Sequence, residues 1–160
     1  MKINTKKIIK GFTLVCCILF FSLKGISQNC DALTRSQLRD LLVQMGYTVK
    51  DIVKTEGKEK YEVSHPGSGF NVPLGYEISA SGNFIWLTAF LGKPDNISAE
   101  KGLAMIRKNA DIQPSFFYVT ASGNIMMADA VENRGVTSTI LRRHIDKIVS
   151  DISNTASIWQ

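Results

Sequence analysis

The sequence predicts one α+β domain, an antiparallel β-sheet with about three packed helices in the order α-β-β-β-β-α-β-β-α. Three segments repeat apolar residues with the period of a helix, and the segments between them are shorter and either alternate or are continuously apolar. Short turns rich in glycine, asparagine and serine join several of these segments, as is typical of antiparallel strands. Such hairpins favour a sheet with helices packed on it over a parallel sheet with crossover helices.

Residues 1–28 precede this domain and have the pattern of an export signal. A basic start, Met1–Lys10, is followed by an apolar run from Gly11 to Leu23 and by small residues before Gln28. The run is shorter than the roughly 20 residues that span a bilayer, so we expect a cleaved signal over 1–28 and a single domain over 29–160. The predicted location is the periplasm or the extracellular space, with no integral membrane segment after cleavage. The alternative is a membrane tether formed by the uncleaved segment.

The positive net charge of the chain comes from this leader. Five of the 19 basic residues and none of the 14 acidic ones lie in residues 1–28, which leaves 14 of each sign in the rest. A balanced domain lacks the basic footprint of nucleic-acid binding, so no nucleic-acid partner is expected. Of the three cysteines only Cys30 follows the leader, which excludes an internal disulfide in the cleaved chain and leaves a tolerated thiol or an intermolecular bridge.

The domain is expected to begin with a short amphipathic helix. Thr34 and Gln37 have the spacing of a capping box, and the helix is expected to end before Gly46. Two partly alternating strands follow near residues 47–53 and 60–65, and a third near 74–80. The predicted buried stripe of the helix is Leu38, Leu41, Leu42 and Met45.

The second half of the chain carries the same unit twice, a hairpin followed by a helix. Ser-Gly-Asn turns precede the apolar strands 84–91 and 125–131, and the second turn follows the strand 116–119. Ser98 and Thr137 are expected to cap the two helices. The stripes expected to face the core are Ala99, Gly102, Leu103, Ile106 and Ala110 in the first helix and Leu141, Ile145, Ile148, Val149 and Ile152 in the second.

The chain resembles the YbjN-like family over about residues 33–159. The resemblance rests on the element order, on the pattern of Leu38–Tyr47 and on the segment Gly135-Val-Thr137. That family usually has a Leu-Asn-x-x-Asn-like segment at the end of its middle helix, of which Met105–Asn109 keeps only the last asparagine. The resemblance implies the fold of type III secretion chaperones and a non-enzymatic, often dimeric module that binds protein segments or acts in regulation. Such relatives are commonly cytoplasmic, so the export signal departs from the family, and fold analogy is a weak guide to function.

No catalytic or metal-binding residue is predicted, and no cofactor is expected. His65 and His144 lack the nearby His, Glu or Cys that a zinc or catalytic site would supply, so both are interpreted as structural or surface histidines. Ser68 lies between two glycines in a loop, without the strand-to-helix turn of a nucleophile elbow.

Two charged features also have structural interpretations. Asp129 interrupts an apolar strand on the same face as Ile125 and Met127, and we expect it at an exposed edge or paired with a lysine or arginine. Arg142 and Asp146 have the spacing of a surface ion pair on a helix.

The feature that most favours a function is the strand 84–91, which is apolar on both faces. A sheet with helices on one face normally turns polar residues to the other. Either the helices cover both faces, or an apolar patch meets a second copy, a partner segment or an apolar ligand. Because aromatic side chains are typical anchors of interfaces, the candidate interface residues are Phe84, Trp86, Phe90, Phe116 and Tyr118.

These observations predict an exported, non-enzymatic module that binds protein or acts in regulation through this apolar face, as a homodimer or with another exported protein. Two alternatives stay open. One is a small hydrolase-like enzyme that uses His65 and the loop 66–75, and the other is a carrier of a small apolar ligand between sheet and helices.

Overall fold

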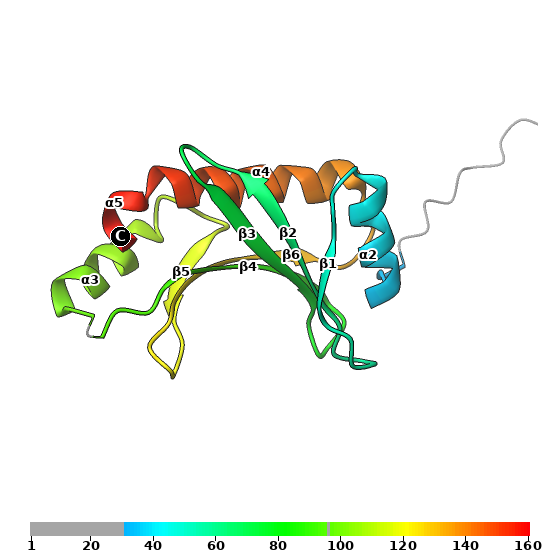
Figure 1. Ribbon diagram of the computed structural model, residues 1–160, viewed down its shortest axis with the longest axis horizontal. Coiled ribbons are helices and arrows are strands. Elements are labelled where there is room, and N and C mark those ends of the chain that lie inside the picture. The colour runs from blue at the N-terminus through cyan, green and yellow to red at the C-terminus, as the bar shows by residue number, and fades with distance from the viewer. Residues whose placement is uncertain (1–30, 96) are drawn as a thin grey trace, which may run out of the picture.

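A six-stranded antiparallel sheet is the frame of the molecule (Figure 1). The computed structural model describes residues 31–95 and 97–160, so the predicted signal and Cys30 lie outside the described residues. The elements follow the predicted order with one addition, the short helix α5. Their bounds are α2 Arg35–Gln44, β1 Lys50–Val53, β2 Lys60–Pro66, β3 Asn71–Ile78, β4 Phe84–Gly92, α3 Ala99–Lys108, β5 Phe116–Val119, β6 Ile125–Glu132, α4 Ser138–Asn154 and α5 Ala156–Trp159.

The strands lie in the order β1-β2-β3-β4-β6-β5. Both predicted hairpins form, β3 with β4 and β5 with β6, and Gly82 and Gly123 adopt the positive φ that their turns require. Strand β6 lies between β4 and β5 and so joins the two hairpin units. Its register places Ala130 opposite Trp86 of β4 and Ala128 opposite Phe116 of β5.

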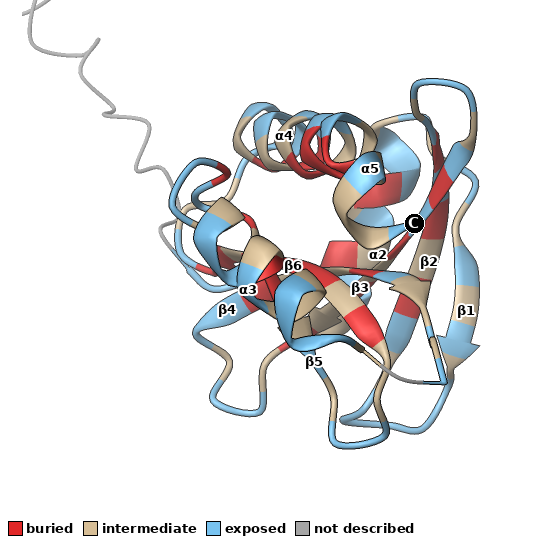
Figure 2. Ribbon diagram, turned by 90° about the vertical axis from the view of Figure 1, so that its left-hand side faces the viewer, coloured by how far each residue is buried: buried red, intermediate tan, exposed pale blue. Residues whose placement is uncertain are grey.

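One face of the sheet packs against the helices and contains the core. Helix α4 runs along this face in Figure 1, and in Figure 2 the buried segments of α4 and of the strands face each other. Thr137 caps α4 as predicted, because its hydroxyl accepts from the backbone N–H of Ile140. The predicted stripe of α4 is confirmed, with Leu141, Ile145, Ile148 and Ile152 buried and Val149 partly buried.

Helix α2 caps and packs as its sequence predicts. The capping box between Thr34 and Gln37 is present, and Leu38 and Leu42 are fully buried in the same core as the α4 stripe. None of the helices within residues 31–95 and 97–160 is long and apolar enough to cross a membrane.

The buried stripe predicted for the middle helix, α3, is wrong. Leu103 and Ile106 are 50% and 67% exposed, and the buried residue is Met105. The physical reason is the position of α3, which contacts strand β5 and helix α5 at one end of the sheet instead of crossing its face (Figure 1). At this position only a narrow strip of the surface of α3 is buried by neighbouring elements.

Candidate functional site: an uncovered aromatic sheet face

The second face of the sheet carries aromatic side chains and no helix among the described residues (Figure 1). In β4, Ile85 and Leu87 are buried under the helices, whereas Phe84, Trp86 and Phe90 point to the other side. Phe84 and Phe90 are 42% and 57% exposed. The helices therefore do not divide between the two faces, and on this face Phe84 and Phe90 are exposed while Trp86 is half-buried.

Four of the five candidate residues form a continuous row of rings, which we call the aromatic row: Phe84, Trp86, Phe116 and Tyr118. Phe84 lies 6.4 Å from Trp86, Trp86 lies 6.3 Å from Phe116 at an interplanar angle of 80°, and Phe116 lies 6.0 Å from Tyr118, all between ring centroids. These distances are within the range of favourable aromatic pairs. The row crosses from β4 to β5 because the intervening strand presents only small side chains there, those of Ala128 and Ala130.

Phe90, the fifth candidate, lies apart from the row. It is on the same face of β4, opposite Met126, but it makes no ring contact with the other four. The structure thus brings four predicted residues together and leaves the fifth separate.

A hollow of about 280 Å³ lies on this face. Its lining residues come from β3, β4, β5 and β6 and are Glu77, Trp86, Thr88, Phe116, Tyr118 and Ala128. Gly75 is paired with Thr88, and a Cβ on Gly75 would lie 2.9 Å from the Thr88 hydroxyl. Glycine at this position therefore lets the Thr88 side chain lie beside β3 at the border of the hollow.

Charged side chains adjoin the hollow on the β1 to β3 side. Glu77 forms an ion pair with Lys60, directly across the β2 and β3 ladder, and Glu62 pairs with Lys50 at 3.2 Å on the same face. Burial raises the pKa of the Tyr118 hydroxyl, Glu77 raises it further, and Lys60 opposes this. Tyr118 is therefore neutral at physiological pH and supplies a hydroxyl as well as a ring.

The two histidines occupy the covered side of the sheet. His65 is buried, its Nε2 lies 2.7 Å from the Tyr76 hydroxyl, and the ring of Tyr47 packs edge-on at 4.8 Å between centroids. Burial lowers the pKa of His65, so the ring is neutral. Strands β2 and β3 extend into the predicted loop, which is reduced to residues 67–70. His65 lies among core side chains, an environment that does not favour the hydrolase alternative.

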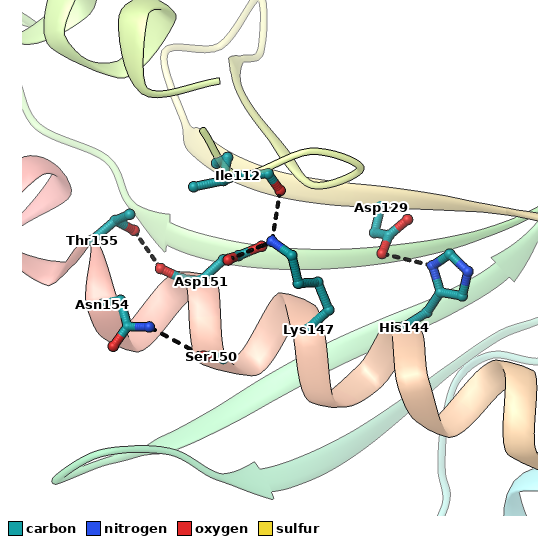
Figure 3. Close-up of polar contacts among 8 residues, drawn as sticks. All are labelled: Ile112, Asp129, His144, Lys147, Ser150, Asp151, Asn154 and Thr155. Carbon is teal, nitrogen blue, oxygen red and sulfur yellow. Dashed lines mark hydrogen bonds and ion pairs between the residues drawn. The ribbon is translucent and has the colours of Figure 1, made fainter. Parts of the chain in front are cut away.

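Asp129 was expected at an exposed edge or beside a lysine or arginine, and both expectations are wrong. The residue is 0% exposed, and its Oδ2 lies 2.9 Å from Nδ1 of His144 on α4 (Figure 3). Its Oδ1 has no hydrogen-bond partner among the described residues, and neither does the buried hydroxyl of Ser115, which precedes β5. A buried carboxylate requires a polar partner, and α4 supplies one.

The predicted surface ion pair between Arg142 and Asp146 is also wrong. The guanidinium of Arg142 donates to the Tyr47 hydroxyl at 3.1 Å and to the Met45 carbonyl at 3.2 Å, and it lies 5.5 Å from the centre of the Tyr47 ring. Arg142 thereby joins α4 to the end of α2. It also borders a surface hollow of about 650 Å³ between these helices.

Two asparagines have roles that the sequence alone did not indicate. Asn109, the C-cap of α3, accepts from the backbone N–H of Phe117 at 2.7 Å and donates to the carbonyl of Phe117 at 3.2 Å. Asn133 is buried and bonds both backbone groups of Leu33 and the carbonyl of Gly82. Asn109 is the one asparagine in which Met105–Asn109 resembles the pattern of the YbjN-like family, and this resemblance was the only signal for it in the sequence.

The described residues contain no group of three or more His, Cys, Asp or Glu side chains that could hold a metal ion. Compared with protein-family models, with curated proteins and with solved structures, the chain matches none. The resemblance to the YbjN-like family therefore rests on the sequence pattern alone.

Proposed function

We propose that this protein is an exported, non-enzymatic binding module that holds a protein partner on the uncovered face of its sheet. The first candidate for the partner is a second copy of the chain, and the alternative is another exported protein. The observation that supports the proposal is the aromatic row, which lies on a face that no described helix covers.

The energetic argument concerns water. Apolar surface gains roughly 25 cal/mol for each Å² that leaves water, and an aromatic side chain offers a large area with few rotatable bonds. Without a partner, Phe84 and Trp86 stay in contact with water, and this free energy of burial is not gained. Aromatic anchors near the centre of a face are what protein interfaces favour, and truncation of such an anchor costs about 2 kcal/mol or more of binding free energy.

The two alternative functions receive less support from the same geometry. A carrier of an apolar ligand between sheet and helices needs space there, and in this layer the buried side chains of α4 pack against those of the strands. A hydrolase that uses His65 needs the imidazole at an accessible position, and its Nε2 is engaged with buried Tyr76. The proposed membership of the YbjN-like family is consistent with a binding module.

The proposal is tested by the mass and the partner capture of Trp86→Glu. Light scattering on the purified protein at low micromolar concentration is expected to give twice the mass of the chain, and Trp86→Glu is expected to give the monomer, because a buried carboxylate would oppose the contact. The matched control is Val43→Glu, which places the same charge at an exposed apolar residue of α2.

If the wild type is a monomer, the second candidate, another exported protein, is tested instead. Cross-linking in the exported protein fraction is then expected to capture a partner with the wild type and with Val43→Glu, but not with Trp86→Glu. A folded Trp86→Glu protein that keeps both its mass and its captured partner would contradict the proposal.

A further inference from the structure

We propose that the hollow in the uncovered face receives a positively charged side chain, lysine or arginine, from the partner protein. This inference rests on the proposed function and specifies the chemistry that the face recognises. It is drawn from three features of the hollow: the arrangement of its rings, its acidic residue and its present ionic contact.

The rings are arranged around the hollow instead of lying in one plane. Trp86 and Phe116 meet at 80°, and Tyr118 is tilted by 43° from Phe116. All three side chains line the same space of about 280 Å³. The face of an aromatic ring attracts a cation, most strongly for tryptophan, and several rings around one space are typical of sites that bind ammonium groups.

The only carboxylic acid in this lining is Glu77, on the β3 side. Its carboxylate and the rings act in the same direction, because both stabilise a positive charge and neither stabilises a negative one. The hydroxyl of Thr88 lines the hollow as well and can accept a hydrogen bond from an N–H donor. An aliphatic ligand would use the rings but leave Glu77 without a new partner.

Lys60 already shows how this acid accommodates an ammonium group. Its Nζ contacts Glu77 Oε2 from the neighbouring strand, and half of the lysine side chain is exposed. An incoming cation therefore replaces an exposed lysine at Glu77, so Lys60 acts as an internal competitor. Removal of Lys60 is expected to strengthen binding, whereas neutralisation of Glu77 is expected to weaken it.

The test uses three short peptides that differ at one side chain. Acetyl-Gly-Lys-Gly-amide, its arginine counterpart and its norleucine counterpart are titrated into the protein at a concentration where light scattering gives the monomer mass. The readout is the NMR signal of the Trp86 indole N–H. Trp159, the other tryptophan of the chain, donates its indole N–H to the Ile152 carbonyl and serves as an internal reference.

The lysine and arginine peptides are expected to shift the Trp86 signal and to bind roughly five- to thirtyfold more tightly than the norleucine peptide. Glu77→Gln is expected to reduce this preference and Lys60→Met to increase it. Added salt is expected to reduce the preference as well, because the carboxylate is partly exposed.

Equal binding of all three peptides, or no Trp86 shift with either basic peptide, would overturn the inference. So would a Glu77→Gln protein that keeps the full preference for the charged peptides. These outcomes are distinct from failure of the proposed function, which is measured by the mass and partner capture of Trp86→Glu. If the partner were recognised through apolar contacts alone, Trp86→Glu would still abolish the dimer or the captured partner, while the peptides would show no preference for a positive charge.

Discussion

The carboxylate of Asp129 lies fully buried with one of its two oxygens bonded to His144. Burial of a charge without a partner is costly, so the contact with His144 lowers the cost of burying this carboxylate between β6 and α4. The pair was not predictable, because the two residues lie 15 positions apart in different elements. Their proximity depends on how α4 is placed over β6. The spacing of residues along the sequence does not predict this placement.

Asp129→Asn is expected to lower the free energy of unfolding by about 1 to 3 kcal/mol, since it removes the charge from a buried hydrogen-bonded pair while keeping the size of the side chain. The measurement is urea unfolding followed by circular dichroism. Asp146→Asn, which removes an exposed acid from the same helix that carries His144, is the control and is expected to stay close to the wild type. Equal stability of Asp129→Asn and the wild type would show that the charge of Asp129 contributes nothing to folding.

His65 predicts a dependence of stability on pH. Burial lowers its pKa below the ordinary value of 6.5, so the unfolded chain takes up a proton at a pH where the folded chain does not. The stability contributed by neutral His65 is therefore complete above about pH 6.5 and declines as the pH falls below that value. His65→Gln is expected to lose less stability than the wild type between about pH 7.5 and pH 5.5.

The measurement compares the free energies of unfolding of the two proteins at both pH values. A pH dependence that is the same in both proteins would assign the acid sensitivity to other groups.

At the scale of the elements, α3 differs most from what its sequence suggests, whereas β5 has its predicted bounds and only its place in the sheet was not predicted. Helix α3 is amphipathic, but its most apolar residues, Leu103 and Ile106, face away from the core. The periodicity of apolar residues in the sequence identifies a helix and its apolar side. It does not show whether a sheet packs against that side. Strand β5 is short and lies at the edge of the sheet, where its outward backbone groups need partners.

Asn109 supplies those partners for Phe117, since one amide side chain both accepts from and donates to the same residue. Asn109→Ala is expected to reduce the free energy of unfolding by about 1 to 3 kcal/mol, because it leaves a partly buried N–H and C=O unpaired. Hydrogen exchange of the Phe117 amide is the direct measurement, and its protection is expected to fall.

Asn154→Ala is the matched control for this change. Asn154 is also an asparagine near the end of a helix, but it is exposed and bonds only the hydroxyl of Ser150. It is expected to leave both stability and Phe117 exchange near the wild-type values. Unchanged exchange in Asn109→Ala would show that solvent replaces the side chain without cost.

At the scale of the whole molecule, the sequence left open whether helices cover both faces of the sheet, and it did not predict the hollow. Alternation along β4 was sufficient to assign Phe84, Trp86 and Phe90 to one side. The sequence did not reveal that β6 lies between β4 and β5, because strand order depends on pairing between distant segments. Only that order places Ala128 and Ala130 between Trp86 and Phe116 and so allows the rings to meet.

Two phenylalanines of this face provide a test of the row as a unit. Phe116→Ala is expected to weaken partner binding or self-association by about 2 kcal/mol or more, because it interrupts the row at its centre. Phe90→Ala is expected to cost less, although Phe90 is the more exposed residue, because it contacts none of the other rings. Sedimentation equilibrium or a binding isotherm measures both. A larger loss for Phe90→Ala would place the centre of the interface elsewhere on the sheet.

Successive side chains of strand β6 contribute to opposite faces of the sheet. Ala128 and Ala130 face the rings, and Asp129 faces α4. Deletion or insertion of one residue within β6 would turn the acid toward the rings and the alanines toward the helix, because strand side chains alternate with a period of two. Changes in chain length are therefore expected to be tolerated in the turn before β6, where Ala121 and Ser122 are exposed, and to be excluded from the strand itself.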